Sequence, residues 1–159
     1  MTLTTISVLS GWLGQLVSLV VPKWLAGSES EALLPEDVGP QIERLRAAED
    51  ELLSSVSDPK TAASYVDRLV YDGFRYVREG VRKSQLGEVI AKRARKLPPI
   101  PPNVTQVVLR MAELRAEANS LTARRGLEVL LTAWLPVHLV SSALAIVVLL
   151  GHMVTVVAW

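Results

Sequence analysis

The chain has 159 residues, with 17 lysines and arginines against 16 aspartates and glutamates, and no cysteine. The lack of cysteine excludes disulfides, thiolate zinc sites, cysteine-ligated iron–sulfur clusters and cysteine nucleophiles. Every charge lies between Lys23 and Glu128, so a charged middle separates two apolar ends. We expect an all-α membrane protein with one C-terminal transmembrane helix, an N-terminal transmembrane or interfacial helix, and a small helical soluble segment between them.

The first apolar end, residues 1–26, has no charged side chain before Lys23 but contains several Ser, Thr and Gly residues. The stretch from about Leu3 to Trp24 is long enough for a transmembrane helix. Its mixed polarity also suits a helix that lies at the membrane interface or packs on a partner. A transmembrane helix is therefore the expectation here, and an interfacial helix is the alternative.

The charged middle of the chain shows helical periodicity and no alternating strand pattern. Its composition divides it into a charged helical segment over 27–97, a proline-rich spacer over 98–102 and a helix leading to the membrane over 103–128. It has few large apolar side chains, so we expect another subunit to complete its core.

The first two helices of this middle part follow from apolar spacing and one turn signal. Residues 27–37 are rich in Ser and Glu and predict a linker. Apolar side chains at helical spacing then predict a helix over 38–56. Asp58-Pro59 begins a second helix, predicted over 60–83, in which Asp72-Gly73 falls inside the helical pattern.

Two polar residues are predicted to begin further helices. Ser84 is expected to N-cap a short basic helix that ends at Lys96. Residues 97–102 contain four prolines, cannot be helical and predict a stiff extended spacer. Asn103 is expected to cap the helix that follows.

The middle part is polarised, because residues 60–125 carry 14 bases against six acids. This basic half adjoins the C-terminal apolar end, which suits a face held near anionic headgroups, and it also suits an ordinary solvated surface. Its densest basic run predicts a membrane-surface or protein contact, and the run consists of Lys92, Arg93, Arg95 and Lys96. No aromatic side chain interrupts the run for bases to stack on, so we expect no nucleic acid.

The middle part offers no catalytic constellation. It has no glycine-rich phosphate loop, no serine nucleophile elbow and no histidine. We therefore expect a non-catalytic protein rather than an enzyme.

The second apolar end, residues 129–159, has no charged side chain and is longer than the roughly 20 residues that a transmembrane helix needs. Trp134 and Trp159 lie at spacings that suit the two membrane interfaces. Pro136 either kinks a helix arriving from the charged middle or starts a new one. Basic residues flank both apolar ends only on the side of the middle part, so the positive-inside rule predicts a cytoplasmic middle and outside termini, in a bacterial inner membrane.

The chain has only two histidines, His138 and His152, and both lie in this uncharged segment. Ionisable residues in a membrane helix are rare and indicate function. Fourteen helical residues bring the two rings to within about 40° of each other around the axis and about 21 Å apart along it. Small side chains lie between them on the same side, at Ser141, Ser142 and Ala145.

Two histidines at this spacing on a transmembrane helix resemble the haem-bearing helices of b-type cytochromes in quinone-linked respiratory and photosynthetic complexes. The resemblance covers about 30 residues. It implies that His138 and His152 are axial ligands to the iron of heme b, and that the chain is a small electron-transport subunit. The larger cytochromes b have a second helix with a matching histidine pair, which this chain lacks. A second copy or a partner subunit would supply the missing ligands, as in the small split cytochrome b of photosystem II.

Other roles for the histidines stay open. Both lie near the ends of the apolar segment, where imidazoles hydrogen-bond lipid headgroups or neighbouring helices, and proton or quinone handling is a third possibility. The alternative function is a cofactor-free membrane anchor or scaffold subunit that docks a soluble partner. In either case the expected partners are the lipid bilayer and other subunits of a membrane complex, or a second copy of the chain.

Overall fold

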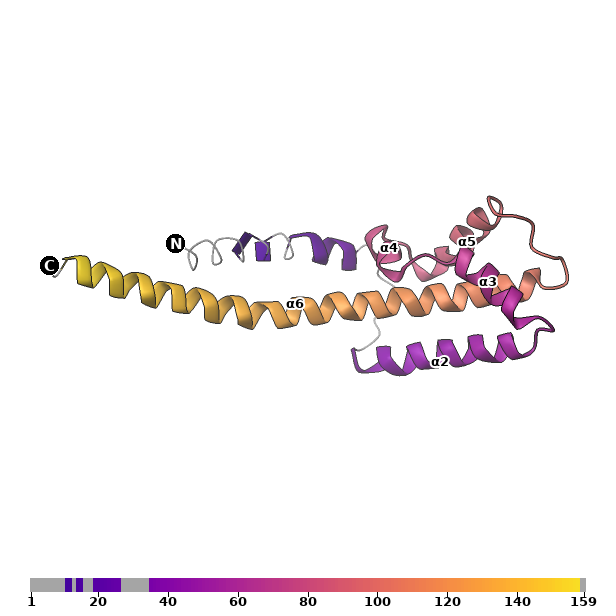
Figure 1. Ribbon diagram of the computed structural model, residues 1–159, viewed down its shortest axis with the longest axis horizontal. Helices are drawn as coiled ribbons and strands as arrows, with labels where there is room; N and C mark the ends of the chain where they lie inside the picture. The colour runs from indigo at the N-terminus through magenta and orange to yellow at the C-terminus, as the bar shows by residue number, and fades with distance from the viewer. Residues whose placement is uncertain (1–10, 13, 16–18, 27–34, 158–159) are drawn as a thin grey trace. The chain divides into compact units, whose positions relative to one another are not determined.

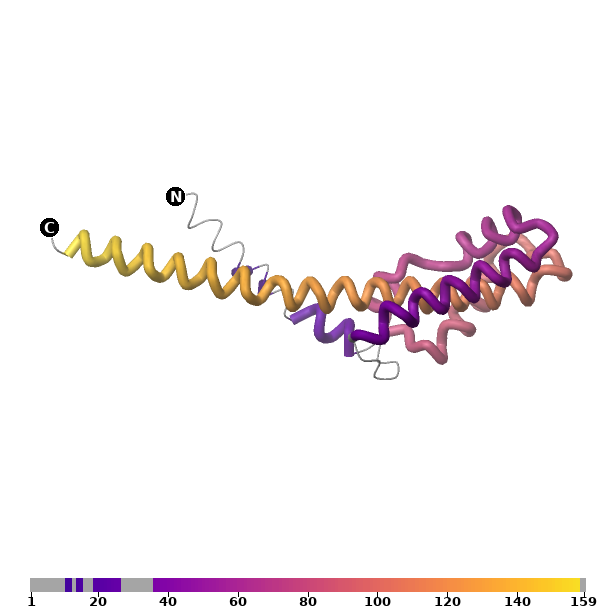
Figure 2. Tube along the Cα trace, turned by 90° about the horizontal axis from the view of Figure 1, so that it is seen from below, coloured from indigo at the N-terminus to yellow at the C-terminus, as the bar shows by residue number. Residues whose placement is uncertain are grey.

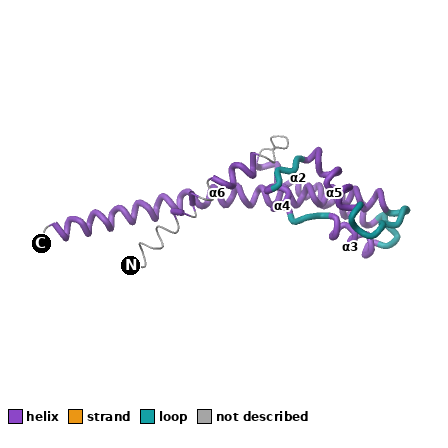
Figure 3. The backbone as a smooth tube through the Cα atoms, turned by 90° about the horizontal axis from the view of Figure 1, so that it is seen from above, coloured by secondary structure: helices purple, strands orange, loops and turns teal. Residues whose placement is uncertain are grey.

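The computed structural model describes residues 11–12, 14–15, 19–26 and 35–157. Within these residues the chain is helical and has no strand, as the sequence predicts (Figure 3). Trp159, most of the predicted 27–37 linker and much of the N-terminal helix predicted over 1–26 lie outside the described residues. The chain divides into two compact units, Met1–Lys23 with Leu127–Trp159, and Trp24–Gly126.

From α2 on, the helices follow one another along the chain, and the connection between α5 and α6 is a longer loop than the others (Figure 1). Their bounds are α2 Pro35–Ser54, α3 Pro59–Leu69, α4 Gly73–Arg78, the 3₁₀ turn η1 Lys83–Gln85, α5 Leu86–Ala94 and α6 Thr105–Val157. The predicted start of a helix at Asp58-Pro59 is confirmed. Asp58 caps α3 by accepting a hydrogen bond from the Thr61 backbone N–H at 3.1 Å. Hydrogen bonds from the side chain and the backbone of Thr61 lower the pKa of the Asp58 carboxyl.

The single helix predicted over 60–83 is wrong, because the chain turns between α3 and α4. Val70 is extended, and the Tyr71 N–H donates to the Tyr76 hydroxyl at 2.9 Å, which fixes the turn. Gly73 packs directly on the α6 backbone, where an added Cβ would lie 1.9 Å from the Asn119 carbonyl oxygen. Gly80 has a φ of 64°, a conformation that glycine adopts readily, just beyond the end of α4.

The two predicted caps at Ser84 and Asn103 are also wrong. Ser84 lies inside η1, and this turn is held instead by the Arg82 N–H, which donates to the Gln85 side-chain oxygen at 3.1 Å. α6 begins at Thr105, whose hydroxyl donates to the Pro101 carbonyl at 2.9 Å. The proline-rich stretch over 97–102 is not helical, as predicted.

α6 is one continuous helix of 53 residues, so the helix expected over 103–128 runs on into the segment expected over 129–159. Pro136 lies inside α6 and does not start a new helix. The C-terminal part of α6 is long and apolar enough to cross a membrane, and none of its most apolar stretch is buried within the structure.

The unit Trp24–Gly126 has its core around the N-terminal part of α6. On one side, Val108 and Met111 are fully buried against side chains of α3, α4 and α5, among them Val66 and Ile90. On another side, Leu114 and further α6 residues pack on α2, which runs alongside this part of α6 in both Figure 1 and Figure 2. The alanines of α6 at 112, 116 and 118 are buried, so neighbouring helices approach its backbone closely.

Ion pairs from α6 hold α2, α3 and η1 in place. Glu49 of α2 is the buried charged residue of the described core, and its carboxylate accepts a hydrogen bond from Arg115 Nε at 2.6 Å. The same guanidinium contacts Asp67 of α3, and Lys83 Nζ lies 2.9 Å from a Glu117 carboxylate oxygen. A buried carboxylate is destabilising unless it is paired, so Arg115 makes the burial of Glu49 tolerable.

The glycine at 73 gives a test of this packing. Gly73→Ala should destabilise the protein by ~1–3 kcal/mol, because the new Cβ overlaps the Asn119 carbonyl of α6. Gly126→Ala is the matched control: a Cβ there meets nothing within 4 Å, and alanine in a helix should stabilise by ~0.5–1 kcal/mol. Unfolding of the full chain in nanodiscs, followed by circular dichroism, measures both. Equal effects of the two substitutions would contradict the packing of α4 on α6.

Candidate functional site

The unit formed by the two ends of the chain contains a row of covered side chains on α6. We call this row the seam, and it consists of Leu127, Leu131, Trp134, His138 and Ser141. Leu127 is buried and the others are half-buried, whereas most of the surrounding α6 surface is exposed. The spacing alternates between four and three residues, as in helices that pack side by side. The seam therefore marks the face of α6 that a neighbouring helix covers.

Residues of the N-terminal segment lie against this seam. Gly14 is buried, and a Cβ added to it would lie 2.5 Å from Trp134 Nε1. Gly11 faces His138, where an added Cβ would be 3.9 Å from the ring atom Cε1. Glycines let two helices approach closely, which is the usual way that apolar helices associate in membranes. Here the absence of a side chain at position 14 makes room for the indole of Trp134.

His138 is held inside this contact. Its ring is stacked on the Trp134 indole, with centroids 6.0 Å apart and planes 14° from parallel. Its Nδ1 atom is buried and has no hydrogen-bond partner within the described residues. Ser141 donates its hydroxyl to the His138 carbonyl at 3.0 Å and so does not serve the ring. A buried ring nitrogen without a partner costs free energy, which suggests that a further group satisfies it.

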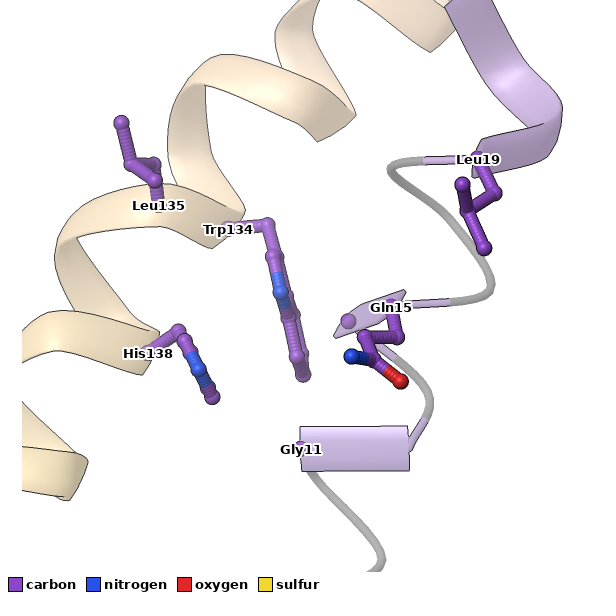
Figure 4. Close-up of a pocket in the computed structure, with 7 residues that line it drawn as sticks. Gly11, Gln15, Leu19, Trp134, Leu135 and His138 are labelled. Atoms are coloured by element: carbon purple, nitrogen blue, oxygen red, sulfur yellow. The ribbon is translucent and has the colours of Figure 1, made fainter.

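A hollow of about 330 Å³ opens beside the His138 and Trp134 rings, and Figure 4 shows Gln15 and Leu19 on the other side of the indole. Its lining residues are Gly11, Gly14, Gln15, Leu19, Trp134, Leu135 and His138. The volume is at the low end of the range for small-molecule sites. The lining is mostly apolar, with an indole N–H, a side-chain amide and an imidazole as its polar groups.

His152 has a different environment, although it lies on the same side of α6 as His138 by helical geometry. All residues over 143–157 are exposed, His152 included. A Cβ added to the adjacent Gly151 would meet nothing within 4 Å. The ring therefore stands among exposed, mostly apolar side chains.

A haem fits these residues unequally. At His152 nothing within the described residues prevents a flat macrocycle from approaching the ring. At His138 the unpaired Nδ1 suits a ligand-bound imidazole, but Trp134 covers one face of the ring and Gly11 lies at its edge. The hollow alone is small for a macrocycle, so a haem at His138 would also need a surface from another helix.

The four basic residues predicted to form a surface contact differ in their exposure. Lys92, Arg95 and Lys96 are exposed, as a surface contact requires. Arg93 instead turns inward: its Nε donates to the Arg68 carbonyl at 2.6 Å, and its guanidinium covers the Tyr71 ring. Arg93 thus has a structural contact that the sequence alone did not indicate.

Sequence reasoning missed the glycines and Gln15, and it treated Trp134 only as an interface marker. The available signal was the spacing of Gly11, Gly14 and Val21. Intervals of three and seven residues place these side chains on one face of a helix, and two of the three are glycines. Comparison with known proteins adds no information: no family, no curated protein and no solved structure matches this chain.

The contact between the N-terminal segment and the seam can be tested by crosslinking, because the chain has no native cysteine. Gly11→Cys with His138→Cys should be joined by a short thiol crosslinker. Gly11→Cys with Gly151→Cys should not, since position 151 lies about 20 Å further along the helix. Adding Gly14→Leu to the first pair should reduce its crosslinking at least ~10-fold, because the side chain would displace Trp134. Equal crosslinking of the two pairs would contradict the contact.

Proposed function

We propose that the chain is a small membrane subunit of an electron-transfer complex and binds one or two b haems through His138 and His152. The C-terminal part of α6 crosses a bacterial inner membrane, and the unit Trp24–Gly126 lies in the cytoplasm. The observation that carries the proposal is the buried Nδ1 of His138, which has no hydrogen-bond partner among the described residues and lies in the uncharged C-terminal part of α6. A histidine ring in such a place is costly unless it binds something.

Within this proposal the residues of the chain have distinct roles. His138 and His152 would hold the haem iron through their ring nitrogens, and the bound haem would supply one-electron redox chemistry. Trp134 stacks on the His138 ring and fixes its orientation, as a supporting residue does for a metal ligand. The open surface around His152 would receive a helix of a partner subunit or of a second copy, which would complete the haem site.

A reduced-minus-oxidised spectrum of the purified complex tests the proposal. The wild type should show the visible absorbance bands of b-type haem, and the His138→Ala, His152→Ala double variant should lose them. His152→Gln should lose the haem at that position, whereas Thr155→Ala one turn away should keep it, because the Thr155 hydroxyl only donates to the His152 carbonyl at 2.7 Å. The absence of these bands from the wild type, or their retention in the double variant, would contradict haem binding.

A cofactor-free anchor is the second candidate, and the packing of His138 favours it. The ring already fits between Trp134 and Gly11, as a purely structural residue would. This function predicts that the histidine substitutions leave assembly of the complex intact. Charge reversal at the exposed residues Arg95 and Lys96 should instead release the soluble partner, as measured by co-purification.

A further inference from the structure

A tyrosine in the turn between α3 and α4 lies between two arginines. The Arg75 Cζ is 3.8 Å from the centroid of the Tyr71 ring, and the Arg93 Cζ is 3.7 Å from it. Two guanidinium groups at this distance do not fit on one face of a phenol ring, so they cover opposite faces. We call Tyr71, Arg75 and Arg93 the Tyr71 cluster.

Three helices hold the Tyr71 cluster in position. The Tyr71 N–H donates to the hydroxyl of Tyr76, whose buried ring also meets the Tyr71 ring edge-on at 5.8 Å. Arg75 is in α4, and Arg93 reaches from α5 to the Arg68 carbonyl at the end of α3. The positions of both cations are thus determined by the fold rather than by free side-chain rotation.

The positive charge of the Tyr71 cluster exceeds its negative charge. Arg75 is paired with Glu79, its Nε lying 2.8 Å from a carboxylate oxygen, and this hydrogen bond raises the pKa of Arg75. Arg93 has no carboxylate partner within the described residues, and it is half-buried. The Tyr76 hydroxyl does not supply the missing charge, because burial raises its pKa and keeps it neutral.

Such an arrangement favours an added anion. A partly buried guanidinium with no counterion, held close to a second guanidinium, is electrostatically unfavourable. The terminal nitrogens of Arg93 and Arg75 are not needed for the hydrogen bonds that their Nε atoms make, so they remain available as donors. Arginine binds phosphate oxygens through paired N–H donors with better geometry than lysine does.

We propose that the Tyr71 cluster binds the phosphate group of an anionic lipid headgroup. The ligand chemistry is a phosphate oxyanion, recognised by Arg75, Arg93 and the edge of the Tyr71 ring. A lipid is the source because the unit Trp24–Gly126 continues at both ends into apolar segments whose charged residues are Lys23 and Glu128 alone, so a bilayer would hold it at a high local concentration of headgroups. The proposal is independent of haem binding.

The experiment uses the full chain in nanodiscs and follows thermal unfolding by circular dichroism. Replacing neutral lipids by a mixture that contains phosphatidylglycerol should raise the unfolding midpoint by ~3 °C or more, because a ligand that binds only the folded state stabilises it. In neutral nanodiscs, inorganic phosphate should give a smaller rise than the anionic lipid, and sodium chloride at the same ionic strength should give none.

Substitutions locate the effect. Arg75→Gln and Arg93→Gln should each reduce the lipid-induced rise by at least half, and the double variant should abolish it. Each rise is measured from the variant's own midpoint in neutral lipid, so a loss of basal stability does not affect the comparison. Arg110→Gln removes an exposed arginine that is paired with Glu113 in α6, and it should leave the rise unchanged.

Three results would overturn the proposal. An equal rise in the wild type and in the double variant would show that general surface charge is responsible. A rise with inorganic phosphate but not with anionic lipid would indicate a free phosphate compound as the ligand. No rise in the midpoint with either anionic lipid or inorganic phosphate would show that the cluster binds no phosphate group, and would point to an acidic protein segment as its ligand.

Discussion

The structure depends on a single helix whose two parts have opposite requirements. From Thr105 to Gly126, α6 is the centre of a helical core and must present covered side chains on several sides. After Glu128 it has no charged side chain and exposes large apolar residues nearly all the way round. A helix satisfies its own backbone hydrogen bonds, so α6 can continue from the helical core into an apolar environment without interruption. The helices α2 to α5 pack on the N-terminal part of α6, where its side chains are buried.

In the apolar part, the seam is what distinguishes one side of α6 from the rest. The N-terminal segment contacts Trp134 and His138 through Gly14 and Gly11, and so it covers one histidine while His152 remains exposed. The two histidines lie on the same side of α6 by helical spacing, but their surroundings differ. One has a ring nitrogen without a hydrogen-bond partner among the described residues, and the other stands on an open surface. Any role for the pair must use one partly covered histidine and one exposed histidine.

Some parts of the fold that depend on local sequence were predictable, whereas the caps expected at Ser84 and Asn103 were not observed. Composition alone indicated the uncharged C-terminal part of α6, and Asp58-Pro59 indicated the start of α3. The break between α3 and α4 was not predictable from periodicity, because periodicity does not show the contacts found there: the Tyr71 N–H donates to the Tyr76 hydroxyl, and Gly73 packs on Asn119, which is distant in the sequence. The same holds for Arg93, assigned to the surface by its basic neighbours but turned toward Tyr71 and Arg68 by the packing of α5 on α3. Local signals identify elements, and long-range contacts decide where they end and which side chains remain free.

The central claim is that the C-terminal part of α6 crosses the membrane. The most direct measurement is labelling of single cysteines in intact cells with a membrane-impermeant maleimide, which the lack of native cysteine makes specific. A cysteine at position 157 should react from outside, and one at position 126 should react only after the membrane is opened. Reaction of both cysteines from the same side would contradict a membrane-spanning α6.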